Sequence, residues 1–230
     1  MFTYYYFKRV VDIITALLGL VVVSPLLAIA IVLLLLSGET SPILMQYRVG
    51  VGAKLFRFYK LRTMKRDKDG FSSSLTLAND NRVTFLGRVL RATKIDELPQ
   101  LFNVINGDLS LVGPRALMPE IFAHYLREDQ LIIGSIRPGV TGLGSVIFRN
   151  EQYLLRKFSE PSEKTYKERI APAKAELEKW YISRQGFFLD VKILVITLWL
   201  LFYSRSKIAW RLIGRLPKKV LWVKHPDQIL

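Results

Sequence analysis

Two adjacent carboxylates, Asp96 and Glu97, lie among cationic residues in an otherwise basic chain. They fall in a dense run from residue 94 to residue 108, with Arg91 shortly before it and Arg115 after it in a Gly-Pro-Arg turn. A carboxylate can act as a nucleophile or hold a hard cation such as Mg²⁺, and a guanidinium group binds phosphate oxygens through paired hydrogen bonds. This combination indicates chemistry on a phosphorylated substrate.

The acidic pair also has a simpler, purely structural interpretation. Thr93 could cap a helix with Asp96 three positions later, or Asp96 could itself be the cap. We expect a helix from Asp96 or Glu97 to Asn106, because Pro99 is tolerated in a first helical turn and the glycine after residue 106 is a typical stop. Such a helix would direct its free backbone amides toward a phosphate group.

Composition narrows the chemistry that the chain can perform. The 230 residues include 34 Lys and Arg against 19 Asp and Glu, a net charge of +15 that implies a polyanionic partner: nucleic acid, an anionic membrane leaflet or a phosphorylated substrate. The absence of cysteine excludes disulfides, thiol nucleophiles and cysteine metal sites, and two histidines leave little for a zinc site. The length fits one moderate domain plus a membrane segment.

A hydrophobic segment near the N-terminus favours a membrane partner. Residues 13–36 carry no charge and are long enough to cross a bilayer as a helix. Pro25, which follows Ser24, should kink or break this helix, and basic residues flank both of its ends, so the positive-inside rule favours neither orientation. We therefore predict a re-entrant helix hairpin over residues 1–38 that turns at Ser24 and Pro25. A kinked helix that crosses the bilayer is the alternative.

The rest of the chain is predicted to form an α/β or α+β fold, predominantly helical with a small strand element. Strand patterns occur at residues 43–47 and 55–59, and helical patterns at residues 85–92, 119–131 and 163–185, the last interrupted at Pro172. The polar residues 67–74 indicate a surface loop. The uncharged residues 193–203 are too few to span a bilayer, so they could lie in the headgroup plane or pack in the core.

Further sequence blocks follow one another in a specific order. They are Gln46-Tyr47-Arg48-Val49-Gly50, the run from Phe56 to Met64 that contains Tyr-Lys-Leu-Arg-Thr-Met, and Ile136-Arg137-Pro138-Gly139-Val140-Thr141-Gly142. Together with the Asp-Glu run and Ser24-Pro25, these blocks resemble the bacterial sugar transferase family. Its members are monotopic phosphoglycosyl transferases, which start glycan assembly on a polyprenol phosphate carrier. The resemblance extends from Ser24 to about Asp190.

The resemblance implies a small catalytic-core member of that family. The expected parts are a re-entrant anchor at residues 1–38, a catalytic core at 39–190, and an interfacial or core-packing segment at 191–230. The implied reaction transfers a phosphosugar from a uridine diphosphate (UDP) sugar to polyprenol (undecaprenyl) phosphate, releases uridine monophosphate (UMP), and initiates assembly of a bacterial glycan. Asp96 would form the covalent intermediate with Glu97 as its partner, and both are candidates to hold Mg²⁺. Assisting the deprotonation of the acceptor is the alternative role for Glu97. The candidates for binding substrate phosphates are Lys60, Arg62, Arg91, Arg115, Arg137 and Arg149.

The resemblance also implies a location and excludes some partners. It places the chain at the bacterial inner membrane, with the catalytic domain on the cytoplasmic face and anionic lipids as partners. One alternative is a noncatalytic membrane scaffold of a glycan pathway, which would tolerate Asp96→Asn. Another is a membrane-tethered nucleic-acid-binding protein, motivated by the charge and by the Arg and aromatic residues interleaved at residues 57–62. That alternative gives the acidic pair no purpose, so no nucleic-acid partner is expected.

Three departures from the family pattern occur near the expected substrate loops. Pro114-Arg115-Ala116 stands where many members have Pro-Arg-Pro, Leu143 where tryptophan is common, and Phe148-Arg149-Asn150 where Asn-Gly-Arg-Asn is frequent. These differences leave the sugar open but do not change the expected reaction class.

Overall fold

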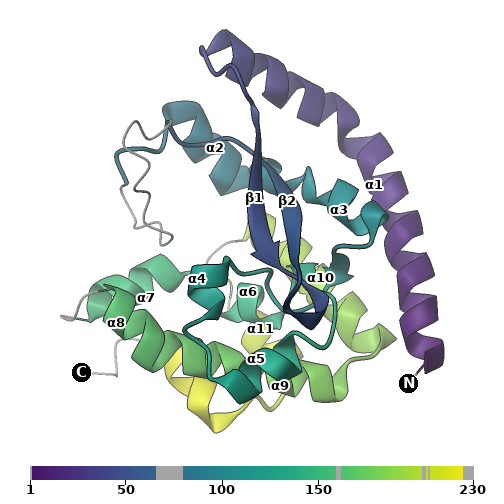
Figure 1. Cartoon of the computed structure of the whole chain (residues 1–230), viewed down its shortest axis with the longest axis vertical. Coiled ribbons are helices and arrows are strands. Elements are labelled where there is room, and N and C mark those ends of the chain that lie inside the picture. Colours follow the sequence, from purple (N-terminus) through teal and green to yellow (C-terminus); the bar gives the residue numbers. More distant parts are fainter. Residues whose placement is uncertain (1, 66–79, 159–161, 204–205, 207, 225–230) are drawn as a thin grey trace.

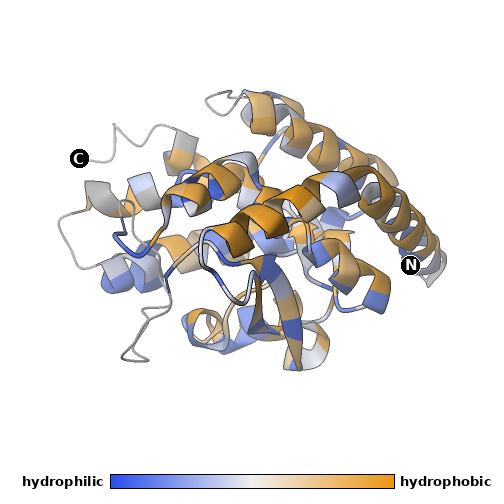
Figure 2. Cartoon of the chain, turned by 90° about the horizontal axis from the view of Figure 1, so that it is seen from above, coloured by the Kyte–Doolittle hydropathy of each residue, from blue (hydrophilic) through white to orange (hydrophobic). Residues whose placement is uncertain are grey.

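The N-terminal helix α1 (Phe2–Leu36) runs along one side of the molecule (Figure 1). The computed structural model describes residues 2–65, 80–158, 162–203, 206 and 208–224, so the loop predicted at residues 67–74 lies outside the described residues. The segment Tyr4–Leu36 is long and apolar enough to cross a membrane, and the helix that ends at the N label is apolar along most of its length (Figure 2).

Ser24 and Pro25, where the re-entrant hairpin was predicted to turn, lie inside α1, which bends midway along its length (Figure 1). A proline removes only one helical hydrogen bond, and the Ser24 hydroxyl donates to the carbonyl of Val21 at 2.9 Å, so the helix continues past the proline. The prediction that this helix re-enters the same leaflet stays a prediction.

The first turns of α1 are fixed to the domain by polar contacts. Asp12 is buried and accepts hydrogen bonds from the Ser110 hydroxyl at 2.6 Å and from the Leu111 amide at 3.2 Å. Arg9 donates to the carbonyl of Val104 at 2.6 Å. Because these charged side chains face protein, this part of α1 belongs to the domain rather than to an isolated anchor.

Two small sheets carry much of the candidate site. The strands β1 (Ile43–Val49) and β2 (Leu55–Leu61) lie where the sequence patterns predict strands. They pair antiparallel, with Ile43 opposite Leu61 and Val49 opposite Leu55. The strands β3 (Ser110–Val112) and β4 (Gly139–Thr141) pair in parallel. These two strands were not predicted, because three residues are too few to show an alternating pattern.

Helices surround both sheets (Figure 1). In chain order they are the 3₁₀ turn η1 (Val51–Ala53), α2 (Phe85–Thr93), the 3₁₀ turn η2 (Ile95–Glu97), α3 (Gln100–Asn106), α4 (Pro119–Phe122), α5 (Arg127–Ile133), α6 (Leu143–Ile147), α7 (Glu151–Lys157), α8 (Ser162–Thr165), the π-helical turn η3 (Tyr166–Ile170), α9 (Ala171–Arg184), α10 (Phe187–Phe202), α11 (Ile208–Leu212) and η4 (Lys218–Lys224). The predominantly helical fold with a small strand element is as predicted.

Individual helix predictions fared differently. The helix predicted at residues 85–92 is confirmed as α2, where the Thr84 hydroxyl caps the first turn by accepting from the Gly87 amide. The single helix predicted at residues 119–131 is wrong, because Leu126 is extended and separates α4 from α5. The interruption predicted at Pro172 is confirmed, since η3 precedes this proline in the first turn of α9.

The core reaches the end of the described chain. In α10, Ile193, Ile196 and Leu200 are buried, whereas Leu198 and Phe202 on its other face are exposed. Buried apolar residues continue through α11 and η4. The inward face of the C-terminal segment therefore packs in the same core as α3 and β3, and within the described residues no break in packing falls at residue 190.

Candidate active site

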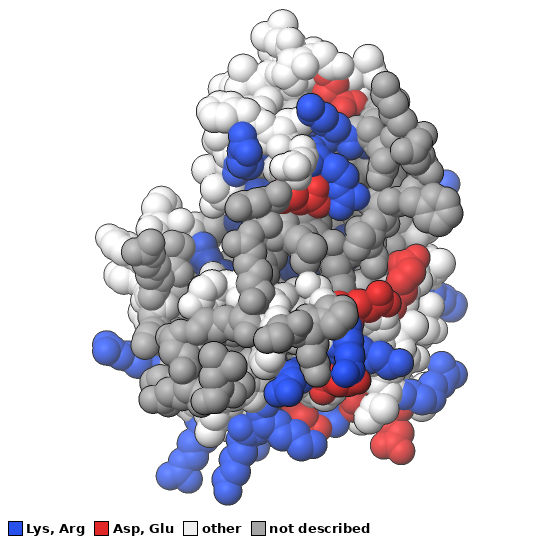
Figure 3. Space-filling view, turned by 90° about the vertical axis from the view of Figure 1, so that its left-hand side faces the viewer, with Lys and Arg blue, Asp and Glu red and all other residues white. Residues whose placement is uncertain are grey.

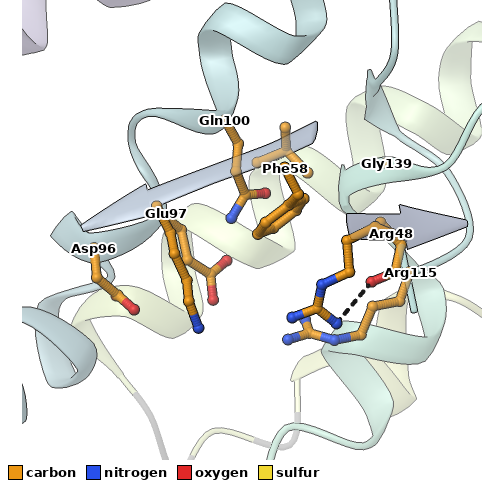
Figure 4. Close-up of a pocket in the computed structure, with 10 residues that line it drawn as sticks. Arg48, Phe58, Asp96, Glu97, Gln100, Arg115 and Gly139 are labelled. Atoms are coloured by element: carbon orange, nitrogen blue, oxygen red, sulfur yellow. Dashed lines mark hydrogen bonds between the residues drawn. The ribbon is translucent and has the colours of Figure 1, made fainter. Parts of the chain in front are cut away.

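A cleft brings both acids together with basic residues from distant parts of the chain (Figure 4). The space between the side chains that line it, open solvent included, measures about 420 Å³. The residues that line it are Arg48, Phe58, Lys60, Asp96, Glu97, Gln100, Arg115, Ala116, Gly139 and Val140. They come from β1, β2, η2, α3, β4 and the turn after β3.

Lys94 sets the direction of the chain before the two acids. Its backbone is left-handed, with φ 60° and ψ 15°, a conformation that is uncommon for a residue with a Cβ atom. This reversal ends α2 and leads into the turn η2, which holds Asp96 and Glu97. The helix α3 begins only at Gln100, after Pro99. The predicted helix start at the acids is therefore wrong, although its predicted end at Asn106 is confirmed.

Neither predicted cap forms. The Thr93 hydroxyl donates back to the carbonyl of Val89 at 2.8 Å, because Thr93 still belongs to the last turn of α2. Asp96 makes no capping hydrogen bond, and its Oδ1 has no hydrogen-bond partner among the described residues. The backbone amides expected to bind phosphate in front of the acids are consequently not arranged as predicted.

The two acids differ in their electrostatic environment. Burial, together with the charge of Glu97, raises the pKa of Asp96 to about 6. Burial also acts to raise the pKa of Glu97, but Lys94 and Arg115 hold that pKa below its usual value. The Nζ atom of Lys94 lies 3.3 Å from Oε1 of Glu97. Glu97 is therefore ionised at neutral pH, while Asp96 can still take up a proton in mild acid.

The acids offer a small oxygen donor set for a metal ion. Within the described part of the chain, no group of three or more His, Cys, Asp or Glu residues could hold a metal. Asp96 and Glu97 alone, with a buried oxygen of Asp96 left unpartnered, fit a hard cation that takes its other ligands from water and substrate phosphates. Mg²⁺ is such a cation.

Basic side chains face the acids across the cleft. Arg48 and Arg115 lie side by side, opposite Asp96 and Glu97 (Figure 4). Burial, with Arg48 and Arg91 nearby, lowers the pKa of Lys60 to about 8, and burial, with Arg115 nearby, lowers the pKa of Arg48 to about 10. Because the cations repel one another and are partly desolvated, an anion that binds between them would relieve both costs.

Three of the six predicted phosphate ligands are placed at or beside this cleft. Lys60 and Arg115 line it. Arg91 lies next to it, since its charge opposes the raised pKa of Asp96, and its Nε donates to the Thr63 hydroxyl at 2.8 Å.

The other three predicted ligands do not line the cleft, and each contacts another part of the protein. Arg62 lies 3.5 Å from the Glu39 carboxylate, Arg137 donates to the carbonyl of Gly107 at 2.9 Å, and Arg149 donates to the carbonyl of Leu200. The order of the sequence motifs grouped these arginines with the cleft residues Lys60 and Arg115, whereas the fold places them away from the cleft.

Sequence reasoning missed several cleft residues. Arg48 stands in the Gln-Tyr-Arg-Val-Gly block, and Gln100 follows Asp96 by four positions. Both positions could therefore have been recognised from the sequence as candidates for the site. Phe58 is two positions before Lys60 in β2, and alternation along a strand places both on one face.

Basic side chains also gather on the lower part of the molecule as Figure 3 presents it, which agrees with the net positive charge.

Comparisons with known proteins give a consistent result. A family model described as bacterial sugar transferase matches residues 3–204. A Bacillus subtilis protein named uncharacterized sugar transferase EpsL is 36% identical over 83% of this chain and 84% of its own length. A UDP-glucose:undecaprenyl-phosphate glucose-1-phosphate transferase of Caulobacter vibrioides is 38% identical over 83% and 67%. A UDP-N-acetylgalactosamine-undecaprenyl-phosphate N-acetylgalactosaminephosphotransferase of Aeromonas hydrophila is 33% identical over 85% of this chain but only 43% of its own.

Proposed function

The chain belongs to the bacterial sugar transferase family, and we propose that it transfers a sugar phosphate from a UDP-sugar to undecaprenyl phosphate with release of UMP. The named relatives support the donor and acceptor classes, with glucose or N-acetylgalactosamine as their sugars. The observation that carries the proposal is the cleft itself, in which buried Asp96, whose Oδ1 has no hydrogen-bond partner among the described residues, faces a cluster of cations.

In the first half of the proposed reaction, Asp96 attacks the phosphorus that carries the sugar. A bond forms between a carboxylate oxygen and this phosphorus, the bond to the bridging oxygen of the diphosphate breaks, and its electron pair leaves with UMP. The attacking oxygen must be ionised, which requires a pH above about 6. Arg48, Lys60 and Arg115 would stabilise the negative charge that develops on the leaving phosphate.

In the second half, the phosphate of the lipid carrier attacks the same phosphorus. The bond to Asp96 breaks, and the carboxylate is regenerated. Asp96 and Glu97 would hold Mg²⁺, which when bound supplies charge neutralisation for the phosphates. Glu97, whose pKa is low, would remain ionised beside Asp96 throughout this cycle.

The proposed location follows from α1 and the charge of the chain. We place α1 in the cytoplasmic leaflet of the bacterial inner membrane and the catalytic cleft on the cytoplasmic side, where both substrates meet. The long apolar helix supports membrane association, and the net charge of +15 favours a surface of anionic lipids. The reaction would initiate assembly of a bacterial glycan.

The test is UMP release by purified protein from a panel of UDP-sugars with undecaprenyl phosphate and Mg²⁺. We expect Asp96→Asn to lower the rate by roughly a thousandfold or more, and Glu128→Gln, an exposed acid on α5, to leave it unchanged. With the acceptor omitted, intact-mass measurement should show one sugar phosphate added to the wild type and none to Asp96→Asn.

Two outcomes would contradict the proposal. If Asp96→Asn released UMP as fast as the wild type, Asp96 would not be the nucleophile. If the wild type released none from any donor, the noncatalytic scaffold would be the better description.

A further inference from the structure

Glu178, in α9, is a buried acid that the proposed chemistry does not use. Its side chain is 4% exposed, and its Oε2 has no hydrogen-bond partner among the described residues. It lines a second, smaller cavity together with Arg115, Gly144 and Lys174. Arg115 lines both this cavity and the catalytic cleft, so it stands between Glu178 and the substrate site.

The carboxylate of Glu178 contacts the backbone of two loops. Glu178 lines the small cavity together with Pro114, Arg115 and Gly144, and the polar backbone groups of Arg115 and Gly144 act to lower its pKa. A Cβ atom on Gly144 would lie 2.3 Å from Oε1 of Glu178, so the carboxylate occupies the space that any larger residue would need. The guanidinium of Arg115, with Nη1 3.5 Å from the Ser145 hydroxyl, reaches the cleft on the other side.

The backbone around Arg115 is held on its other side by β4. The Gly139 amide donates to the carbonyl of Pro114 at 2.8 Å, and an isolated bridge joins Arg115 to Gly139. Glu178 therefore supplies the contact that comes from the helical layer, while β4 supplies the one from the sheet. Together they fix the point from which the Arg115 side chain extends.

Burying this acid has a cost that the fold must offset. Burial raises the pKa of Glu178 to about 7, against the backbone groups of Arg115 and Gly144 and the nearby charges of Lys174 and Arg115. Lys174 itself forms its ion pair with Glu151. A buried carboxylate without a dedicated ion pair destabilises a fold, which makes a role in ordering the site the better explanation for its position.

We propose that Glu178 is a positioning residue for Arg115: it anchors the backbone of the Pro114-Arg115 turn and of Gly144, so that the guanidinium is held at the substrate phosphates. The inference rests on the proposed function, in which Arg115 binds the donor diphosphate. A displacement of about 1 Å at such a group can cost on the order of a hundredfold in rate.

A double-mutant cycle on UMP release tests this inference. We expect Glu178→Ala to lower kcat/KM for the UDP-sugar by roughly 10- to 100-fold in the wild-type background. In an Arg115→Ala background the same substitution should cost less than about threefold, because its target is already gone. Glu176→Gln on the same helix is the matched control and should be neutral in both backgrounds. Equal effects of Glu178→Ala in both backgrounds would overturn the proposal.

A second measurement guards against loss of folding and against failure of the proposed function. Glu178→Gln keeps the size of the side chain and one acceptor oxygen, so it should retain the fold and recover part of the activity lost in Glu178→Ala. In Glu178→Gln, hydrogen-deuterium exchange at the Arg115 and Gly144 amides should be faster than in the wild type, and exchange in α2 should be unchanged.

The exchange measurement needs no turnover. If the wild type released no UMP, the proposed function would fail, while faster exchange at both amides would still support the anchoring role. Unchanged exchange at these amides in Glu178→Gln would overturn that role, whatever the enzyme assay shows.

Discussion

Asp96→Asn should stabilise the protein at neutral and alkaline pH, even as it abolishes the proposed reaction. The pKa of Asp96 is about 6 in the folded chain, against an ordinary value of 3.8. The folded state therefore binds this proton more tightly than the unfolded state does. Stability falls as pH rises from about 4 to about 6, and the full penalty persists above that range.

The size of the penalty follows from the pKa difference. A shift of about two units corresponds to roughly 3 kcal/mol of unfolding free energy at pH 8, and to almost nothing at pH 4. Asp96 is only 7% exposed, so solvent screens little of this energy. For a chain of this length, one kcal/mol moves the melting temperature by about 2 to 4 °C, which sets an upper limit of roughly 6 to 12 °C.

The assay is thermal unfolding of detergent-purified wild type and Asp96→Asn between pH 4 and pH 8, with a chelator present. The stabilisation should grow through this range and level off above about pH 6. Adding Mg²⁺ should raise the melting temperature of the wild type more than that of the variant, because the metal would neutralise the same buried carboxylate.

A control with the opposite sign is available on α9. Lys179 holds the pKa of Glu176 below its usual value through a 2.8 Å contact, so Glu176→Gln should destabilise slightly at pH 8, by less than about 1 kcal/mol. If Asp96→Asn changed the melting temperature equally at pH 4 and pH 8, or lowered it at pH 8, the reasoning about the buried acid would be refuted.

Two further predictions concern positions whose surroundings differ sharply. Arg115→Ala should raise the KM for the UDP-sugar by roughly 10- to 100-fold, because a charge-assisted hydrogen bond is lost. Arg149 lies away from the cleft, so Arg149→Ala should change this KM by less than about twofold. Equal KM values for the two variants in steady-state assays would contradict this placement. Gly87→Ala should lower the free energy of unfolding by about 1 to 3 kcal/mol, since the new Cβ would lie 2.1 Å from a backbone oxygen. In Gly186→Ala the new Cβ would meet its nearest atom at 3.9 Å, so this variant should be nearly neutral. Matching melting temperatures for the two variants in thermal unfolding would contradict this prediction.

Local patterns were enough to predict α2, the strands β1 and β2, although not their pairing, and the end of α3. Each of these depends on residues close in sequence: an apolar helical face, an alternating strand, and a glycine stop at Gly107 with φ 95°. The start of α3 was missed because it depends on Lys94, a residue type that gives no signal for left-handed backbone. Tertiary contacts, rather than propensity, place the two acids.

The candidate site was predicted in its chemistry but only partly in its membership. Motif order grouped six cations, yet backbone carbonyls of the folded chain take up Arg137 and Arg149. Glu178 was missed for a different reason. In sequence, Lys174 and Glu178 are four positions apart on one helix, which is the usual pattern of an exposed ion pair. Only the packing of α6 against α9 reveals that both are buried.

The membrane helix and the cleft are linked through short chains of contacts. Arg9 donates to a carbonyl in α3, the helix that carries Gln100 into the cleft. Asp12 holds Ser110 in β3, and the chain leaves β3 directly into the turn that presents Arg115. Because the same helix contacts α3 and β3, the depth at which it lies in lipid would set the position of the cleft relative to the bilayer.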